Sequence, residues 1–259
     1  MRALAPVVLF RAACDVTDPR AVERAFEEHR PWAVINAAGS PDVDAAEYDF
    51  PLTDAIHFRA ALNIANRCAA HGIALASFSS DAVFDICDEQ PATESMPTHP
   101  VNTYGVVKAA ADVAILQAHP QALVARTGLL IGFERRDPVE AMIRALKRGE
   151  RVQVADDEAF SAAHVGEFAN AVLDLLVDRE QGLWHVTDGA KRSWAELITA
   201  IAPTCLSRRV VRVPGATLGR PATRPHYCVL GSERAILLND LDHAVRRLER
   251  RARTRPAVA

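Results

Sequence analysis

Three side chains in the middle of the sequence have the types and spacing needed to reduce a carbonyl group. Ser80 lies 24 residues before Tyr104, and Lys108 lies four residues after it. Carbonyl reduction builds negative charge on oxygen, so a nearby group must donate a proton. A tyrosine can do this when an adjacent ammonium lowers the pKa of its phenol, and a serine hydroxyl can orient the carbonyl. The alternative is a surface tyrosine that happens to lie beside a surface lysine.

The elements around these residues alternate between strand and helix. Buried-strand patterns are found at residues 7–10, 32–36, 73–79, 122–126 and 182–187. Helical patterns are found at residues 19–29, 52–71, 103–118, 138–149, 164–178, 193–201 and 232–250. This order predicts an α/β fold of the Rossmann-like, doubly wound type: a parallel sheet covered by helices on both faces.

The ends of several helices carry recognisable capping residues. Asp18 precedes Pro19, Gly72 follows an Ala-rich helix, and Ser193 is followed three residues later by Glu196. These are signals for an N-terminal cap, a left-handed C-terminal cap and a capping box, respectively.

Polar residues stand at or just past the carboxyl ends of three predicted strands: Asn36, Ser80 and Thr127. Ligands of parallel sheets bind beyond these strand ends. The sequence therefore predicts one crevice that collects the three side chains. Tyr104 and Lys108 lie on one face of the following helix because they are four residues apart.

Composition narrows the functional classes. The chain has 259 residues, 49% of them hydrophobic, and a formal net charge of −3. A charge this small gives no global attraction to nucleic acid or to an anionic membrane, and no apolar run is long enough to span a bilayer. We therefore expect no nucleic-acid or membrane partner. The sequence has no internal repeat and no low-complexity linker, so we expect its two halves to pack as one body, and the scattered cysteines favour a reduced, cytoplasmic setting.

Neither cysteines nor histidines form a metal-binding pattern. The five cysteines lack Cys-x-x-Cys spacing, which argues against zinc and against a disulfide framework. Four histidines are possible metal ligands, but none has paired spacing with another ligand, which favours ordinary packing or surface residues: His57, His164, His185 and His226. We therefore predict no metal site.

A set of short motifs runs in order along nearly the whole chain. The motifs occupy residues 15–18, 30–39, 43–47, 78–85, 100–108, 126–127, 184–185, 193–196 and 220–221. In this order they resemble the extended short-chain dehydrogenase/reductase family, and within it the dTDP-4-dehydrorhamnose reductases.

The resemblance implies reduction of a 4-keto sugar nucleotide by NADPH or NADH, with NADPH favoured. It implies that Ser80, Tyr104 and Lys108 are catalytic. Cofactor contacts are expected from Asp15, Val16, Ala37, Ala38 and Gly39, together with Tyr104 and Lys108. Substrate contacts are expected from Ser80, Asp81, Asn102, Thr127 and Arg220.

The resemblance also implies two parts and a possible homodimer. Residues 1–135 would bind the dinucleotide. Residues 136–259 would form the smaller substrate-binding lobe, with residues 164–187 returning to the first part.

The sequence departs from the family pattern at several points. No glycine occurs before Gly39, whereas the family begins with a strand and a glycine-rich turn that holds the pyrophosphate. We therefore expect the first strand and this turn to be missing. The family's Val-Asn pair reads Ile56-His57, a usual glycine is Ile86, and a usual tryptophan after Arg-Thr-Ser is Leu129.

These departures keep two other functions open. The missing turn favours a non-catalytic module that binds a sugar nucleotide or a protein, as a regulatory subunit does. Epimerisation or dehydration on the same scaffold ranks lower, because Ser80-Asp81 stands where dehydratases often carry Asp-Glu.

Overall fold

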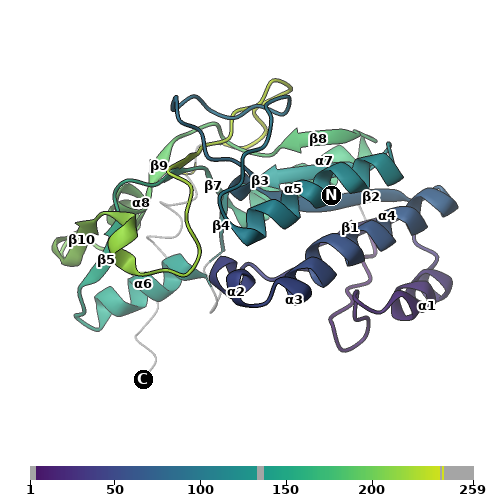
Figure 1. Cartoon of the computed structure of the whole chain (residues 1–259), viewed down its shortest axis with the longest axis horizontal. Helices are drawn as coiled ribbons and strands as arrows, with labels where there is room; N and C mark the ends of the chain where they lie inside the picture. Colours follow the sequence, from purple (N-terminus) through teal and green to yellow (C-terminus); the bar gives the residue numbers. More distant parts are fainter. Residues whose placement is uncertain (1–3, 133–136, 240, 242–259) are drawn as a thin grey trace.

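The computed structural model describes residues 4–132, 137–239 and 241, and its centre is a four-stranded parallel sheet. The strands are β1 (Ala33–Asn36), β2 (Ala74–Ser80), β3 (Leu123–Thr127) and β8 (Gly182–His185), in the spatial order β1-β2-β3-β8 (Figure 1). In this register Ser80 lies opposite Thr127. The predicted Rossmann-like parallel sheet is thus confirmed.

Helices cover both faces of the sheet. Helices α4 (Ala60–His71) and α5 (Thr103–Ala118) pack on one face, with α1 (Pro19–His29) beside α4. Helix α7 (Val165–Val177) packs on the other face. Neighbouring residues of β3 serve opposite faces: Leu123 contacts the α7 side, whereas Val124 contacts the α4 and α5 side. This follows from the two-residue period of a strand.

The predicted caps are confirmed. The Asp18 carboxylate accepts a hydrogen bond from Arg20 N, and Gly72 ends α4 with a φ of 64°. Ser193 and Glu196 form the capping box of α8 (Trp194–Ile201). These local signals predicted the helix boundaries well because capping depends only on residues within one turn.

The helix predicted over residues 52–71 has a different internal structure. It consists of α3 (Phe50–Asp54), a π-helical turn (Ala55–Arg59) and α4 in direct succession. The short helix α2 (Val43–Tyr48) precedes it.

The strand predicted at residues 7–10 is wrong. These residues have no regular secondary structure and pair with no strand of the described chain, and their side chains are exposed. An apolar run makes a strand only where a neighbouring strand offers hydrogen bonds. None of the helices in the described ranges is long and apolar enough to cross a membrane.

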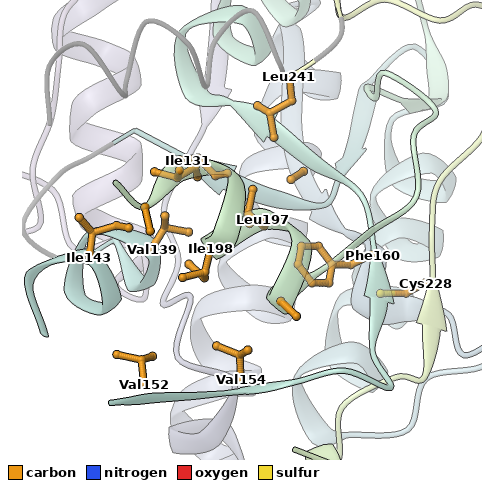
Figure 2. Packing of buried hydrophobic residues seen from close by; sticks show 14 of the residues in the cluster. Ile131, Val139, Ile143, Val152, Val154, Phe160, Leu197, Ile198, Cys228 and Leu241 are labelled. Atoms are coloured by element: carbon orange, nitrogen blue, oxygen red, sulfur yellow. The ribbon is translucent and has the colours of Figure 1, made fainter. Parts of the chain in front are cut away.

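The second part of the molecule lies at the left of Figure 1. It contains α6 (Pro138–Lys147), α8 and three small sheets. The sheets pair β5 (Val152–Ala155) with β10 (Val210–Val213), β4 (Leu129–Ile131) with β7 (Ala162–His164), and β6 (Ala159–Phe160) with β9 (Arg192–Ser193) and β11 (Tyr227–Cys228). Helices α6 and α8 pack together, and Ile143 of α6 and Ile198 of α8 belong to one buried apolar cluster (Figure 2).

Strand β8 belongs to the central sheet although it follows α6 and the first small strands in sequence. The chain therefore returns to the sheet through α7 and β8. The helix predicted from residue 232 is not formed at residues 232–239. The rest of that prediction lies, apart from Leu241, outside the described residues.

Candidate active site

Tyr104 and Lys108 are held beside Ser80 by the first turns of α5. Asn102 caps this helix: its side-chain oxygen accepts from Gly105 N at 2.8 Å. Gly105 has no side chain, and a Cβ there would overlap the carbonyl oxygen of Ala82. The backbone of α5 therefore lies directly against the turn that follows Ser80. The Ser80 side chain is close enough to the Tyr104 phenol to lower its pKa by hydrogen bonding.

Asp81 is buried next to this pair. Ser80 Oγ donates to its carboxylate over 3.1 Å, and the Cys228 thiol, from β11 of the second part, donates to it over 3.5 Å. Burial raises the pKa of Asp81 to about 7. The predicted substrate residue Asp81 thus lies beside the candidate proton-transfer pair and connects the two parts of the molecule.

Burial governs the titration of Tyr104. It raises the pKa of the phenol to about 12, the negative charge of Asp81 raises the pKa further, and the hydrogen bond with Ser80 opposes both. We expected a lowered pKa, and this expectation is wrong for the ligand-free protein. The physical reason is that desolvation of a phenolate outweighs the neighbouring groups.

Lys108 is committed to the backbone on one side. Its ammonium donates to the carbonyl oxygen of Phe78 in β2. Burial lowers the pKa of Lys108, while Asp112, one turn further along α5, raises it. An ammonium has three hydrogens, so the contact with Phe78 leaves donors for a ligand.

The residues after β1 form an open strip of small side chains. Ala37, Ala38 and Gly39 are exposed. The side-chain oxygen of Asn36, Oδ1, accepts a hydrogen bond from Ala38 N at 3.2 Å. The ring of His57 closes the inner side of this strip, because a Cβ on Gly39 would lie 2.9 Å from its Cε1.

Thr127 ends β3 directly beside Ser80. Its side chain is buried, and its Oγ1 has no hydrogen-bond partner among the described residues. A buried hydroxyl without a partner is costly, which makes Oγ1 a candidate ligand contact.

Asp15 and Val16 lie in the loop before α1. The Asp15 carboxylate accepts from the amide and hydroxyl of Thr17 and pairs with Arg11, and Val16 packs in the cluster on the α4 side of the sheet. The hydrogen bonds of Asp15 are thus local, and none of them joins it to Ser80, Tyr104 or Lys108.

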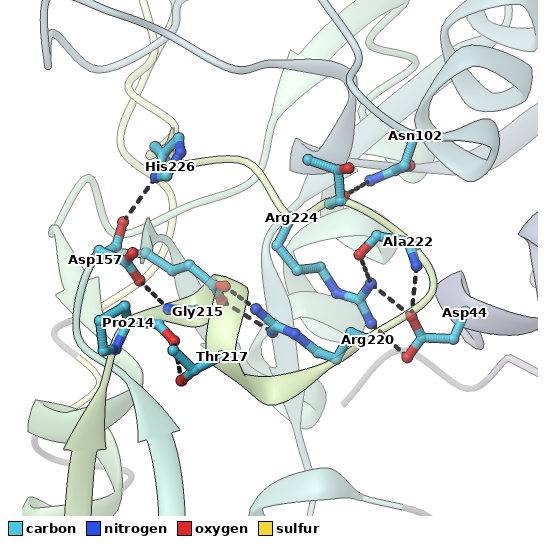
Figure 3. Close-up of polar contacts among 12 residues, drawn as sticks. Asp44, Asn102, Asp157, Pro214, Gly215, Thr217, Arg220, Ala222, Arg224 and His226 are labelled. Carbon is cyan, nitrogen blue, oxygen red and sulfur yellow. Dashed lines mark hydrogen bonds and ion pairs between the residues drawn. The ribbon is translucent and has the colours of Figure 1, made fainter.

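Arg220 belongs to a strap, residues 214–226, that crosses from the second part of the molecule to the first (Figure 3). Its guanidinium forms a two-point ion pair with Glu158. Four residues on, Arg224 binds both carboxylate oxygens of Asp44, each at 2.9 Å. Asn102 Nδ2 donates to Thr223 O at 2.9 Å, which ties the strap to the residue that caps α5.

Three residues at this site were missed from the sequence: His57, Cys228 and Arg224. A second Arg-Pro pair at residues 224–225 was the available signal for Arg224. The sequence analysis treats His57 as a departure from a family pattern and as an ordinary packing or surface histidine, not as a residue of this site. Cys228 had no local signal, because its contact with Asp81 spans 147 positions.

Comparison with known proteins identifies the family of this chain. The family model described as RmlD substrate binding domain matches residues 2–246. A Streptomyces griseus dTDP-4-dehydrorhamnose reductase is 31% identical over 245 residues, covering 90% of this chain and 79% of that protein. A probable dTDP-4,6-dihydroxy-2-methyloxan-3-one 4-ketoreductase of Streptomyces antibioticus is 34% identical over 226 residues, covering 85% and 76%.

A solved structure shares the same architecture. The dTDP-4-dehydrorhamnose reductase of Bacillus anthracis, crystallised with NADP, superposes with a TM-score of 0.85 at 24% identity, covering 93% of this chain and 88% of that one. With the family match over most of its length, the chain belongs to the RmlD substrate-binding-domain family, the family of the dTDP-4-dehydrorhamnose reductases.

Proposed function

We propose that this protein reduces the 4-keto group of a dTDP-linked deoxysugar, with NADPH as the reductant. The observation that carries the proposal is the arrangement of Ser80, Tyr104 and Lys108 at the carboxyl end of β2, on a chain whose relatives are named as 4-keto reductases. The B. anthracis relative with NADP supports the choice of cofactor.

Tyr104 is the proton donor in this proposal. A pKa raised to about 12 keeps the phenol protonated at neutral pH, so the proton is available when negative charge develops on the substrate oxygen. Ser80 orients that oxygen. Lys108 stabilises the phenolate once the proton has left, because a nearby ammonium favours the charged phenol.

The sugar nucleotide lies between the two parts of the molecule. Asp81 and Thr127 bind hydroxyl groups of the sugar, and Asn102 and Arg220 act from the cap of α5 and from the strap. Arg220 pairs with Glu158 through one N–H of Nη1 and one of Nη2. A guanidinium has five N–H groups, so the remaining donors are available to an anion of the substrate.

The described residues fit the nicotinamide half of the cofactor. Ala37, Ala38 and Gly39 leave the end of β1 open, and Lys108 keeps donors for ribose hydroxyls. When bound, the nicotinamide supplies the hydride. We expect Asp15 and Val16 on the adenine side. No glycine-rich turn leads into a helix at this crevice within the described ranges.

Tyr104→Phe tests the proposal. The change removes the proton donor and keeps the ring, so NADPH oxidation with a dTDP-4-keto-6-deoxysugar falls about 10²–10⁴-fold, while the melting temperature changes little. Tyr48→Phe, at an exposed tyrosine, is the matched control and keeps wild-type turnover. Equal turnover in both variants rejects Tyr104 as the donor.

A second function is a binding module without catalysis. Titration calorimetry separates the two functions: the module binds a dTDP-sugar saturably, does not bind NADPH, and is unaffected by Tyr104→Phe. Binding of NADPH with turnover of the sugar excludes it.

A further inference from the structure

His57 lies at the centre of the π-helical turn between α3 and α4. π-Helical turns are rare and occur frequently at functional sites. The side chain of His57 is 6% exposed. Its ring meets that of Tyr104 edge to face, with centroids 5.2 Å apart and an angle of 83° between the planes.

The hydrogen bonding of the ring defines its tautomer. Ser40 N donates to His57 Nε2 at 3.3 Å, so Nε2 carries the lone pair. Burial and the positive charge of Lys108 lower the pKa of His57 to about 4. The ring is therefore neutral at physiological pH, and its hydrogen is on Nδ1.

Nδ1 is buried and has no hydrogen-bond partner among the described residues. His57 and Lys108 line the same small cavity, together with Asn36 and Asp112. The imidazole offers Lys108 no acceptor, because its one lone pair is already bound to Ser40 N–H. The Lys108 ammonium donates a hydrogen bond to the backbone carbonyl oxygen of Phe78.

Gly39 is part of the same arrangement. A Cβ at this position would lie 2.9 Å from Cε1 and 3.4 Å from Nδ1 of His57. The ring therefore reaches the backbone after β1 on one side and the phenol of Tyr104 on the other, and it spans the space between the two.

We infer that His57 is a positioning residue for Tyr104 and Lys108: the Nδ1–H tautomer, set by Ser40 N–H, packs against the ring of Tyr104 and offers Lys108 no acceptor, so the ammonium donors not used by Phe78 O stay available to ligands. This role rests on the proposed reduction, but its structural content does not depend on turnover. No contact with the reacting atoms is involved, since His57 acts through its two neighbours.

The tautomer is tested by ¹⁵N NMR of the protein alone. The expected spectrum has a protonated Nδ1 and an unprotonated Nε2 between pH 5 and 8. Lys108→Met removes the neighbouring charge and raises the pKa of His57, whereas the control Lys191→Met, at an exposed lysine, leaves it unchanged. The inference is overturned if the ring carries its hydrogen on Nε2, or if the pKa of His57 is the same in Lys108→Met as in the wild type.

Two substitutions divide the role into its parts. His57→Phe keeps a ring against Tyr104 but cannot bind Ser40 N–H, whereas His57→Asn keeps an acceptor and a donor but loses the ring. ¹³Cζ labelling of the three tyrosines follows the Tyr104 phenol directly. Its pKa falls from about 12 toward 10 in His57→Asn, because water reaches the phenol, and it stays high in His57→Phe.

Turnover gives the second readout. Each variant lowers kcat about tenfold or more and leaves the KM for the sugar nucleotide within about threefold, since substrate contacts are intact. His119→Asn, at a buried histidine that contacts Ile73 O, is the control and keeps kcat.

Wild-type kcat and an unchanged Tyr104 pKa in His57→Asn overturn the inference. If wild-type protein lacks turnover, the NMR results alone decide the inference, and the proposed function fails separately.

Discussion

Burial decides the protonation of the individual groups at this site. Tyr104 and Asp81 both have raised pKa values, and burial is the first cause in each case. The negative charge of Asp81 in turn raises the pKa of Tyr104. A proton on Asp81 therefore makes Tyr104 a stronger acid, and the two groups titrate as neighbours rather than independently.

Asp81 makes the stability of the protein depend on pH. Its pKa is about 7 in the folded protein and 3.8 ordinarily, so the folded state binds the proton more tightly. The contribution of Asp81 to the free energy of unfolding is fully present below about pH 4. It is lost as the pH rises from there through 7, and the loss is on the order of 4 kcal/mol.

Asp81→Asn tests this dependence in chemical unfolding at pH 5 and pH 8. Wild-type protein loses more stability between the two pH values than the variant, because the variant has no group to ionise. Asp88→Asn, at an exposed carboxylate, retains the wild-type difference. A difference that survives in Asp81→Asn assigns the effect to another group.

At the scale of elements, the site depends on how closely α5 approaches the end of β2. Asn102 begins the helix, and Gly105 permits its first turn to contact the backbone of Ala82. This approach sets the position of Tyr104 relative to Ser80. A helix of the same length, shifted outward by one side chain, would separate the two hydroxyls.

Gly105→Ala tests this contact. Alanine favours a helix over glycine by about 1 kcal/mol, but overlap with Ala82 O costs about 1–3 kcal/mol. We expect a lower melting temperature and at least a tenfold lower turnover. Val106→Ala, at the exposed neighbouring position, leaves both unchanged. A more stable and fully active Gly105→Ala variant would show that α5 does not need this approach.

The strap over residues 214–226 is held by carboxylates from both parts of the molecule. Asp44 of α2 binds Arg224 and Ala222 N, and Asp157 binds Gly215 N at 2.7 Å. These ties hold the strap beside Asn102 and, through the following β11, place Cys228 against Asp81.

Arg224→Met loosens the strap in hydrogen-exchange mass spectrometry. The variant keeps the aliphatic stem and loses the ion pair, so amides of residues 215–226 exchange about tenfold faster, equivalent to about 1.4 kcal/mol. Arg212→Met, at an exposed position of β10, serves as control. If the amides of residues 215–226 are equally protected from exchange in both variants, the remaining hydrogen bonds of the strap hold it without the Arg224–Asp44 ion pair.

At the scale of the whole molecule, the central sheet has an exposed edge at β1. Ile35 in this strand is 42% exposed, and Trp32 just before it is 60% exposed. Val7, Val8 and Phe10 are exposed as well. No strand in the described part of the chain pairs with the outer edge of β1. An open strand edge with apolar side chains favours association between molecules.

Ile35→Lys therefore reduces concentration-dependent association, measured by light scattering, because edge lysines oppose strand pairing. Val113→Lys adds the same charge to the exposed face of α5, 56% exposed in the wild type, and leaves association unchanged. If Val113→Lys is the variant that dissociates, the contact lies on α5 instead.

The sequence alone determined the features that depend on neighbours within one turn or one strand. Three features are of this kind: the caps at Asp18, Gly72 and Ser193, the positions along the chain of the central strands after residue 30, and the four-residue spacing of Tyr104 and Lys108. Hydrogen-bonding caps and side-chain periodicity are local, so they are visible without the fold.

Only the tertiary structure decided the features that join distant residues. It left residues 7–10 without a partner strand, placed Cys228 on Asp81, and set His57 between Gly39 and Tyr104. It also turned the expected fall in the pKa of Tyr104 into a rise. Pairing, burial and desolvation depend on the complete surroundings of a group, and one turn of sequence does not contain them.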